Sequence, residues 1–147
     1  MTVEQLSVFL ENQSGRLADL ADTLGRAGVD ILALSLADMA DFGIVHLLVN
    51  RTDLAQEVLT AAGFTVNRGQ VVAVAVPRQP GGLARVLRAL EAEGVNVEHI
   101  YALNVPLATL TALEGAFLFR FDQPDRARAV LESAGARVVP GEEVYAS

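Results

Sequence analysis

The most constraining feature of this 147-residue sequence is an internal repeat that relates its two halves. An apolar pattern that opens at Gly15 returns 66 positions later at Gly81. In each copy the apolar residues recur at the spacing of one helical face: Leu17, Leu20, Ala21 and Leu24, then Leu83, Val86, Leu87 and Leu90. Glycines match as well, as Gly28 with Gly94 at this offset and, 72 positions apart, Gly43 with Gly115 and Gly63 with Gly135. The repeat predicts two copies of one small unit.

Each copy is predicted to contain six elements in the order strand, helix, strand, strand, helix, strand. The predicted bounds in the first copy are Leu6–Leu10, Arg16–Ala27, Ile31–Ala37, Gly43–Val49, Asp53–Ala62 and Thr65–Arg68. Those in the second copy are Val71–Val76, Leu83–Glu93, Val97–Ala102, Ala116–Phe121, Pro124–Ala134 and Arg137–Val139. Asn50 and Asp122 are predicted to cap the second helix of each copy. This order predicts an α+β protein of two ferredoxin-like βαββαβ units, with antiparallel sheets and helices on one face.

The boundary between the two units is predicted near Arg68–Val71, which gives domains of residues 1–69 and 70–147. The last strand of the first copy runs almost directly into the first strand of the second, so we expect a short linker and a rigid pair. One copy is small for a stable core, so we expect the copies to pack on each other. The larger second offset predicts six extra residues within Ala102–Glu114, which form either a flap over a site or a plain long loop.

The composition excludes several functions. The 11 basic residues against 18 acidic ones give a net charge of −7, which opposes nucleic-acid binding. The absence of cysteine excludes disulfides, thiolate nucleophiles and cysteine-based metal sites. With only two histidines, His46 and His99, we expect no metal site, no cofactor and no catalytic residue. The start of the chain has no basic or long apolar segment, so we expect a cytoplasmic protein without membrane contact.

The turn before the first helix of each copy is the strongest candidate for a binding site. It spans Glu11–Leu17 in the first copy and Pro77–Leu83 in the second. A glycine allows the backbone to approach a ligand, and a helix N-terminus offers unpaired N–H groups with a partial positive charge. The residues whose backbone N–H groups can hold a carboxylate in this way are Gly15, Arg16 and Leu17, and Gly81, Gly82 and Leu83.

These turns and the segments after them resemble the ACT domain, a small regulatory module of amino-acid metabolism. The pattern of that family is an acidic-Asn-x-Pro-Gly-x-Leu turn, an amphipathic helix and Gly-(Val/Ile)-(Asn/Asp)-(Ile/Val), as in Gly28–Ile31 and Gly94–Val97. The stretch Leu34–Ile44 is similar to stand-alone proteins with two ACT domains. The resemblance covers nearly the whole chain, in two copies.

The resemblance implies that Asn12, Gly15 and Asp30 contact an amino-acid ligand in the first copy, and Gly81 and Asn96 in the second. Asp30 and Asn96 are expected beside the turns, or else they only cap the chain after the preceding glycines. The rest of the candidate ligand-binding set comes from the same motifs: Ser14, Arg16, Leu17, Ile31, Arg78, Pro80, Gly82, Leu83 and Val97.

The copies depart from the family pattern at two positions. Ser14 replaces the usual proline, and Arg78 stands where the first copy has Asn12. Arg78 either pairs with a ligand carboxylate or is solvated. Elsewhere, His99 beside Tyr101 either lines a pocket or is an ordinary strand residue, and His46 is expected at the surface or as a satisfied core histidine.

In the ACT family, ligand sites lie where two domains meet, so the resemblance implies a side-by-side pair within a homodimer. It implies a non-catalytic regulatory protein that binds a free amino acid and acts in trans on amino-acid metabolism. One alternative is a regulatory subunit of an amino-acid biosynthetic enzyme, similar to the small subunit of acetohydroxyacid synthase. Another is a hydrolase similar to acylphosphatase, for which Arg78, Gly81 and Gly82 supply a loop fragment but no activated nucleophile or base is evident.

Overall fold

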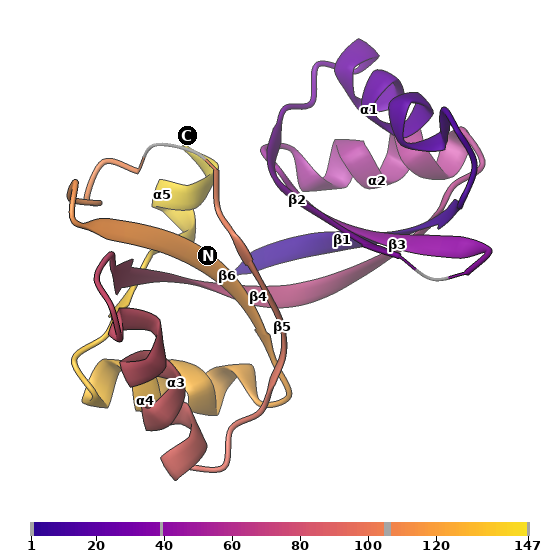
Figure 1. Ribbon diagram of the computed structural model, residues 1–147. Coiled ribbons are helices and arrows are strands. Elements are labelled where there is room, and N and C mark those ends of the chain that lie inside the picture. Colours follow the sequence, from indigo (N-terminus) through magenta and orange to yellow (C-terminus); the bar gives the residue numbers. More distant parts are fainter. Residues whose placement is uncertain (1, 39, 105–106, 147) are drawn as a thin grey trace. The chain divides into compact units, whose positions relative to one another are not determined.

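The computed structural model describes residues 2–38, 40–104 and 107–146 (Figure 1). The chain divides into two compact units, Glu4–Gly69 and Gln70–Ser147 with Met1–Val3. The division falls within one long strand, β4 (Thr65–Pro77). The sequence predicted two separate strands at this place, whereas Gly69 and Gln70 continue the extended chain between them.

The first unit has the predicted βαββαβ arrangement. Its elements are β1 (Val3–Glu11), α1 (Arg16–Arg26), β2 (Ile31–Asp38), β3 (Phe42–Val49), α2 (Thr52–Ala61) and the first part of β4. The strand order is β2-β3-β1-β4, and β3 is antiparallel to both of its neighbours, with Leu47 opposite Leu6 of β1 and Leu34 of β2. Alternate residues of the strands meet one face of each helix, so a single core lies between the sheet and the two helices.

The second unit repeats this arrangement and adds a short helix. It contains the rest of β4, α3 (Gly82–Ala92), β5 (Val97–Ala102), β6 (Glu114–Phe121), α4 (Pro124–Ser133), β7 (Arg137–Val138) and α5 (Gly141–Tyr145). The strand order is β5-β6-β4-β7, and β6 is antiparallel to both of its neighbours. Val74 and Phe119 of the sheet, with Leu90 of α3 and Leu131 of α4, are fully or almost fully buried in its core.

Helix α5 was not predicted from the sequence. It lies across the sheet of its unit from α3 and α4 (Figure 1), and Val144 is fully buried but lies outside the core on the α3–α4 side. Its five residues are too few to show an amphipathic period, so only the burial of Val144 identifies its packed side. The described part of the chain holds no helix that is both long and apolar enough to cross a lipid bilayer.

The repeat is visible in the backbone torsion angles as well as in the sequence. The glycines with positive φ form three pairs across the repeat: Gly15 with Gly81, Gly28 with Gly94, and Gly63 with Gly135. At Gly15 and Gly81, φ is 91° and 83°, a conformation that turns the chain from a strand into a helix and that other residues rarely adopt. Gly28 and Gly94 also have positive φ, and each lies just after the end of its helix, α1 or α3. The predicted glycine stops at these two positions are therefore confirmed.

The predicted caps of α2 and α4 are wrong. The residues at the cap positions are Arg51 and Gln123, and neither makes a side-chain cap hydrogen bond. Asn50 Oδ1 instead accepts from the backbone N–H of Asp30 at 2.9 Å. Asp122 Oδ1 accepts from the backbone N–H of Asn96 at 3.0 Å. Each side chain thus joins the end of one strand to the start of its neighbour. It pairs a backbone N–H, that of Asp30 or of Asn96, which the strand-to-strand hydrogen bonds leave without an acceptor.

Gly82 carries a steric constraint that can be tested directly. A Cβ at this position would lie 2.2 Å from the backbone oxygen of Pro77, so that backbone would have to move. We expect Gly82→Ala to lower the free energy of unfolding by about 1–3 kcal/mol. Gly25→Ala is the matched control, because Gly25 lies inside α1 with open space around it and alanine favours the helix by about 0.5–1 kcal/mol. Urea denaturation of both variants measures the two effects, and equal effects of the same sign would contradict this packing.

Candidate functional site

The two β–α turns have the same hydrogen-bonded backbone. In the first unit, the N–H of Asn12 donates to the oxygen of Asp41 at 2.9 Å, and the N–H of Arg16 to the oxygen of Gln13 at 3.3 Å. In the second unit, the corresponding bonds run from Arg78 to Leu113 at 2.7 Å and from Gly82 to Gln79 at 3.0 Å. The turns are thus tied both to the following helix and to the neighbouring strand connection, which fixes the position of each helix start.

The helix starts leave backbone donors available to a ligand. Among the described residues, the N–H groups of Leu17 and Ala18 have no hydrogen-bond acceptor, and neither have those of Leu83 and Ala84. Gly15 and Gly81, at the cap positions, carry no side chain that could accept from them. Both turns therefore present unpaired N–H groups at the positive end of a helix, which favours an anion such as a carboxylate.

A cavity lies beside the turn of the first unit. It has a volume of about 340 Å³ and is bounded by Leu10–Gln13 of the turn, Leu17 of α1, Leu36 and Ala37 of β2, and Gly43 of β3. The Asn12 side chain is held at this turn, because its Nδ2 donates to the backbone oxygen of Ala40 at 3.0 Å. The predicted residues Asn12 and Leu17 thus line one cavity, with Gly15 and Ser14 in the same turn.

Asp30 and Asn96 do not lie beside the turns of their own units, so that expectation is wrong. Glu11, at the end of β1, is opposite Phe42 at the start of β3. Ile31, at the start of β2, is opposite Val49 at the far end of β3. Asp30 is therefore at the opposite end of the sheet from Gly15, and Asn96 stands in the same relation to Gly81. The residues after them, Ile31 and Val97, are partly buried against the two cores.

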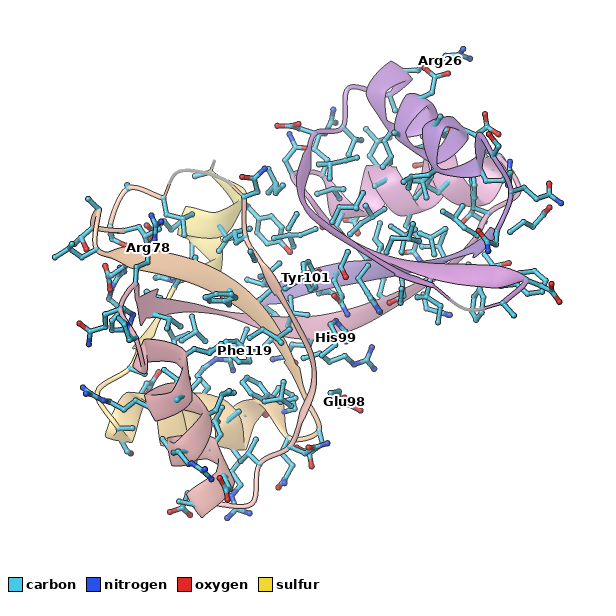
Figure 2. The ribbon with its side chains drawn as sticks, viewed as in Figure 1. Arg26, Arg78, Glu98, His99, Tyr101 and Phe119 are labelled. Atoms are coloured by element: carbon cyan, nitrogen blue, oxygen red, sulfur yellow. The ribbon has the colours of Figure 1, made fainter. Side chains whose placement is uncertain are left out.

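Arg16 and Arg78 have different environments. The guanidinium of Arg16 lies 4.8 Å above the centre of the Phe64 ring and pairs with Asp19 at 3.1 Å, so this side chain is folded onto its own unit. The side chain of Arg78 projects from the turn of the second unit (Figure 2) and has no ion-pair partner in the described part of the chain. Of the two, Arg78 is the one available to an incoming carboxylate.

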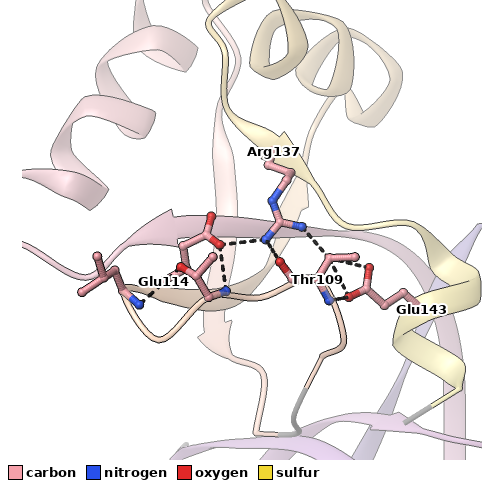
Figure 3. Close-up of polar contacts among 6 residues, drawn as sticks. Thr109, Glu114, Arg137 and Glu143 are labelled. Atoms are coloured by element: carbon pink, nitrogen blue, oxygen red, sulfur yellow. Dashed lines mark hydrogen bonds and ion pairs between the residues drawn. The ribbon is translucent and has the colours of Figure 1, made fainter.

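The long β5–β6 connection is anchored by Arg137 and Glu143, a feature that the sequence did not reveal. Arg137 of β7 donates to the hydroxyl of Thr109 at 2.6 Å, to the backbone oxygen of Thr109 at 3.0 Å and to Glu114 at 2.9 Å (Figure 3). Glu143 of α5 accepts from the backbone N–H and the hydroxyl of Thr109 at 2.8 Å and 2.7 Å. Thr109 is thereby fixed between β7 and α5. Val105 and Pro106 of the predicted insertion lie outside the described residues.

This network lowers the pKa of two of its carboxyl groups. Hydrogen bonding by the Thr111 backbone, followed by that of Arg137, holds the pKa of Glu114 below its usual value. The Thr109 hydroxyl and then the Thr109 backbone lower the pKa of the Glu143 carboxyl. Both groups are thus stabilised in the charged form that the network requires.

The histidines are in the strands and away from the turns. The ring nitrogen Nδ1 of His46 lies 3.1 Å from the Ser7 hydroxyl across the β1–β3 pair. His99 stacks on Tyr101 along β5 with ring centres 5.8 Å apart (Figure 2), and burial raises the pKa of the Tyr101 phenol. Within residues 2–38, 40–104 and 107–146, no cluster of His, Asp or Glu has the makings of a metal site.

The sequence and the structure were both compared with known proteins. The family profile described as an ACT domain pair matches residues 1–144. A crystal structure of a Bacteroides thetaiotaomicron protein is 34% identical, with a TM-score of 0.88 over 99% of this chain and 96% of that one. The ligand-free regulatory subunit of aspartate kinase from Thermus thermophilus has the same fold at 18% identity, with a TM-score of 0.64 over 91% of this chain and 93% of that one. No curated protein matches the sequence.

The Arg137 network predicts a pH-dependent contribution to stability. The pKa values of Glu114 and Glu143 are lowered in the folded protein, so their contribution is complete above the ordinary glutamate pKa of about 4.3 and is lost as the pH falls through the folded values. We expect Arg137→Gln to lower the melting temperature at pH 7 and to have a much smaller effect at pH 3. Arg88→Gln is the control, because its pair with Glu91 is exposed and contributes little at any pH. Equal effects of Arg137→Gln at both pH values would contradict the charge-based account.

Proposed function

The chain belongs to the ACT domain family, and on that premise we propose that it is a non-catalytic regulatory protein that binds a free amino acid and acts in trans on amino-acid metabolism. The ACT domain pair is a regulatory rather than a catalytic type of domain. We assign residues 1–69 and 70–147 to its two ACT domains. Regulation by such a protein requires that the bound ligand favours one state of the protein or of a partner over another.

The observation that carries this proposal is the unpaired backbone N–H groups at the starts of α1 and α3, directly after Gly15 and Gly81. Free N–H groups at Leu17 and at Leu83 suit the α-carboxylate that all amino acids share. In the first domain the adjoining cavity of about 340 Å³ gives space for the rest of a small ligand. The roles we propose are carboxylate binding by the backbone of Gly15–Leu17 and of Gly81–Leu83, with Asn12 or Arg78 as the polar side chain at each turn.

The position of Asp30 and Asn96 supports ligand binding between copies of the chain. An amino acid also needs an acceptor for its ammonium group, and the exposed Asp30 carboxylate is a suitable one. Since Asp30 lies at the far end of the sheet from the turn of its own unit, it can reach a turn-bound ligand only when that turn is supplied by another domain. We propose that a second copy of the chain supplies it, which makes the functional form a homodimer.

The free edge of the first sheet is suited to such an assembly. Strand β2 ends the strand order, and Leu34 and Leu36 on it have exposed fractions of 41% and 50%. An apolar edge strand with unpaired backbone groups readily takes up a further strand. The same feature favours the second candidate function, in which this edge binds a biosynthetic enzyme and the chain is a regulatory subunit. The Thermus thermophilus aspartate kinase regulatory subunit has a fold of this kind.

The first test is a thermal-shift screen of the protein against the common free amino acids at millimolar concentration. A ligand at about 100 times its dissociation constant adds about 2.7 kcal/mol to the free energy of unfolding. We expect one amino acid or a related group to raise the melting temperature, and Asn12→Ala to reduce that shift. Asn67→Ala is the control, because it removes an exposed asparagine from β4, away from both turns.

Asp30→Ala and Asn96→Ala then decide whether these two residues, which directly precede β2 and β5, take part in ligand binding. Loss of the shift in either variant, without loss of the fold, supports an ammonium acceptor at that position. If no amino acid shifts the melting temperature of the wild-type protein, the sensor function is wrong and the regulatory-subunit alternative takes its place.

The homodimer is tested by placing a charge on the edge strand. We expect the wild-type protein to sediment as a dimer and Leu34→Lys to sediment as a monomer, since a lysine on an edge strand opposes pairing. Leu113→Lys is the control, because Leu113 is 78% exposed but belongs to the β5–β6 connection. A dimer that persists in Leu34→Lys would show that the β2 edge is not the interface.

A further inference from the structure

The second unit contains a cavity beside α3. This cavity lies on a different face of the helix from the one that Leu17 of α1 turns toward the cavity of the first unit. It lies between α3 and the chain that leads from α4 into β7, and its volume is about 310 Å³. Most of its wall is apolar and is formed by Ala75, Pro77, Val86, Ala89 and Ala136. The polar groups at it are few, chiefly Arg85 of α3 and the Glu114–Arg137 ion pair. A mainly apolar wall with a few polar groups is typical of small-molecule sites.

The first unit shows what a filled version of this place looks like. The residue that corresponds to Gly82 is Arg16, and the one that corresponds to Ala136 is Phe64. The Arg16 guanidinium covers the Phe64 ring at 4.8 Å, and Phe64 is 6% exposed. The second unit has neither side chain, so the space between α3 and the chain that leads into β7 is left open.

The charge of this place also differs between the two units. Arg85 corresponds to Asp19, which in the first unit neutralises Arg16 at 3.1 Å. In the second unit no acidic residue among those described pairs with Arg85. Arg137 is already paired with Glu114 at 2.9 Å, so these two charges offset each other. The uncompensated charge at the cavity is therefore the positive charge of Arg85.

We propose that this cavity is a second ligand site, which binds a small monocarboxylate with a short branched aliphatic chain. The Arg85 guanidinium is positioned to pair with the carboxylate, because planar guanidinium and carboxylate groups form paired hydrogen bonds. The alanine, valine and proline side chains of the wall accommodate the aliphatic part. This site shares only Gly82 with the amino-acid site proposed above, and it needs neither a second copy of the chain nor Asn12.

The charges at the cavity wall favour a ligand that has no ammonium group. Glu114 is the acidic group there, and its Oε1 accepts hydrogen bonds from the Thr111 backbone and from Arg137. It is thus committed to the network that holds the β5–β6 connection. A ligand with an anionic head and an apolar tail therefore matches this cavity better than a zwitterion does.

The experiment measures binding of isovalerate, with isovaleramide as its uncharged counterpart of the same shape. Titration followed by ¹H–¹⁵N correlation spectra reports saturable binding and locates it on the protein. We expect isovalerate to shift the resonances of Gly82, Arg85 and Ala136, and isovaleramide to bind at least tenfold more weakly, since the charge-assisted pair is lost.

Two variants and one matched control decide the assignment. Arg85→Gln should weaken isovalerate binding about tenfold or more, and Ala136→Phe should abolish it by restoring the ring that fills this place in the first unit. Arg88→Gln removes a positive charge from the same helix at a residue outside the cavity wall, and binding should be unchanged. Melting temperatures of all variants confirm that they are folded.

The proposal is overturned if the wild-type protein does not bind isovalerate saturably, or if Arg85→Gln and Ala136→Phe leave the affinity unchanged. It is also overturned if isovaleramide binds as tightly as isovalerate, because the charge of Arg85 would then be irrelevant. Asn12→Ala separates the two sites: it should reduce the amino-acid shift and leave isovalerate binding intact, so either site can fail without the other.

Discussion

The core between one sheet face and two helices is the feature on which the rest of each unit depends. Leu20 and Leu24 of α1, and Val86 and Leu90 of α3, supply this core from equivalent helix positions. In so small a unit the same packing leaves the other surfaces uncovered, because surface is large relative to volume. The β2 edge, the two β–α turns and, in the second unit, the space beside α3 therefore remain open. At these open places the two copies differ in their side chains, as Asn12 and Arg78 or Arg16 and Gly82 show.

The duplication separates what the fold requires from what a site requires. The turn backbone is preserved in both copies, with φ of 91° at Gly15 and 83° at Gly81 and the same pair of hydrogen bonds around each. The side chains around that backbone are not preserved, since Asn12 is replaced by Arg78. A backbone carboxylate site can be copied unchanged, whereas the groups that recognise the rest of a ligand diverge. Under the function proposed above, the two domains would take ligands that share a carboxylate but differ elsewhere.

The fold could be predicted from the sequence because it rests on periodicity and on glycine. The apolar spacing along α1 and α3 gave both helices to within a residue or two, and Gly28 and Gly94 marked their ends. The site could be predicted only in part. Asp30 was expected at the wrong end of its unit, although the predicted order makes the first two strands parallel and so places the start of β2 at the opposite end of the sheet from the end of β1. The Arg137 network and the cavity at Arg85 join residues from separate elements, and no local pattern signals such contacts.

The cavity of the second unit and the β5–β6 connection are physically linked through two residues. Glu114 and Arg137 line the cavity, and Arg137 also fixes Thr109. A ligand that changes the position of this pair must therefore change how firmly the connection is held, and the reverse is required by thermodynamic reciprocity. The described residues of the first unit form no such link, because Thr65 and Phe42 take the places of Arg137 and Glu114. Three features thus distinguish the second copy: a longer connection, an open cavity, and the Glu114–Arg137 ion pair between them. This arrangement is expected if a ligand in the cavity controls the connection.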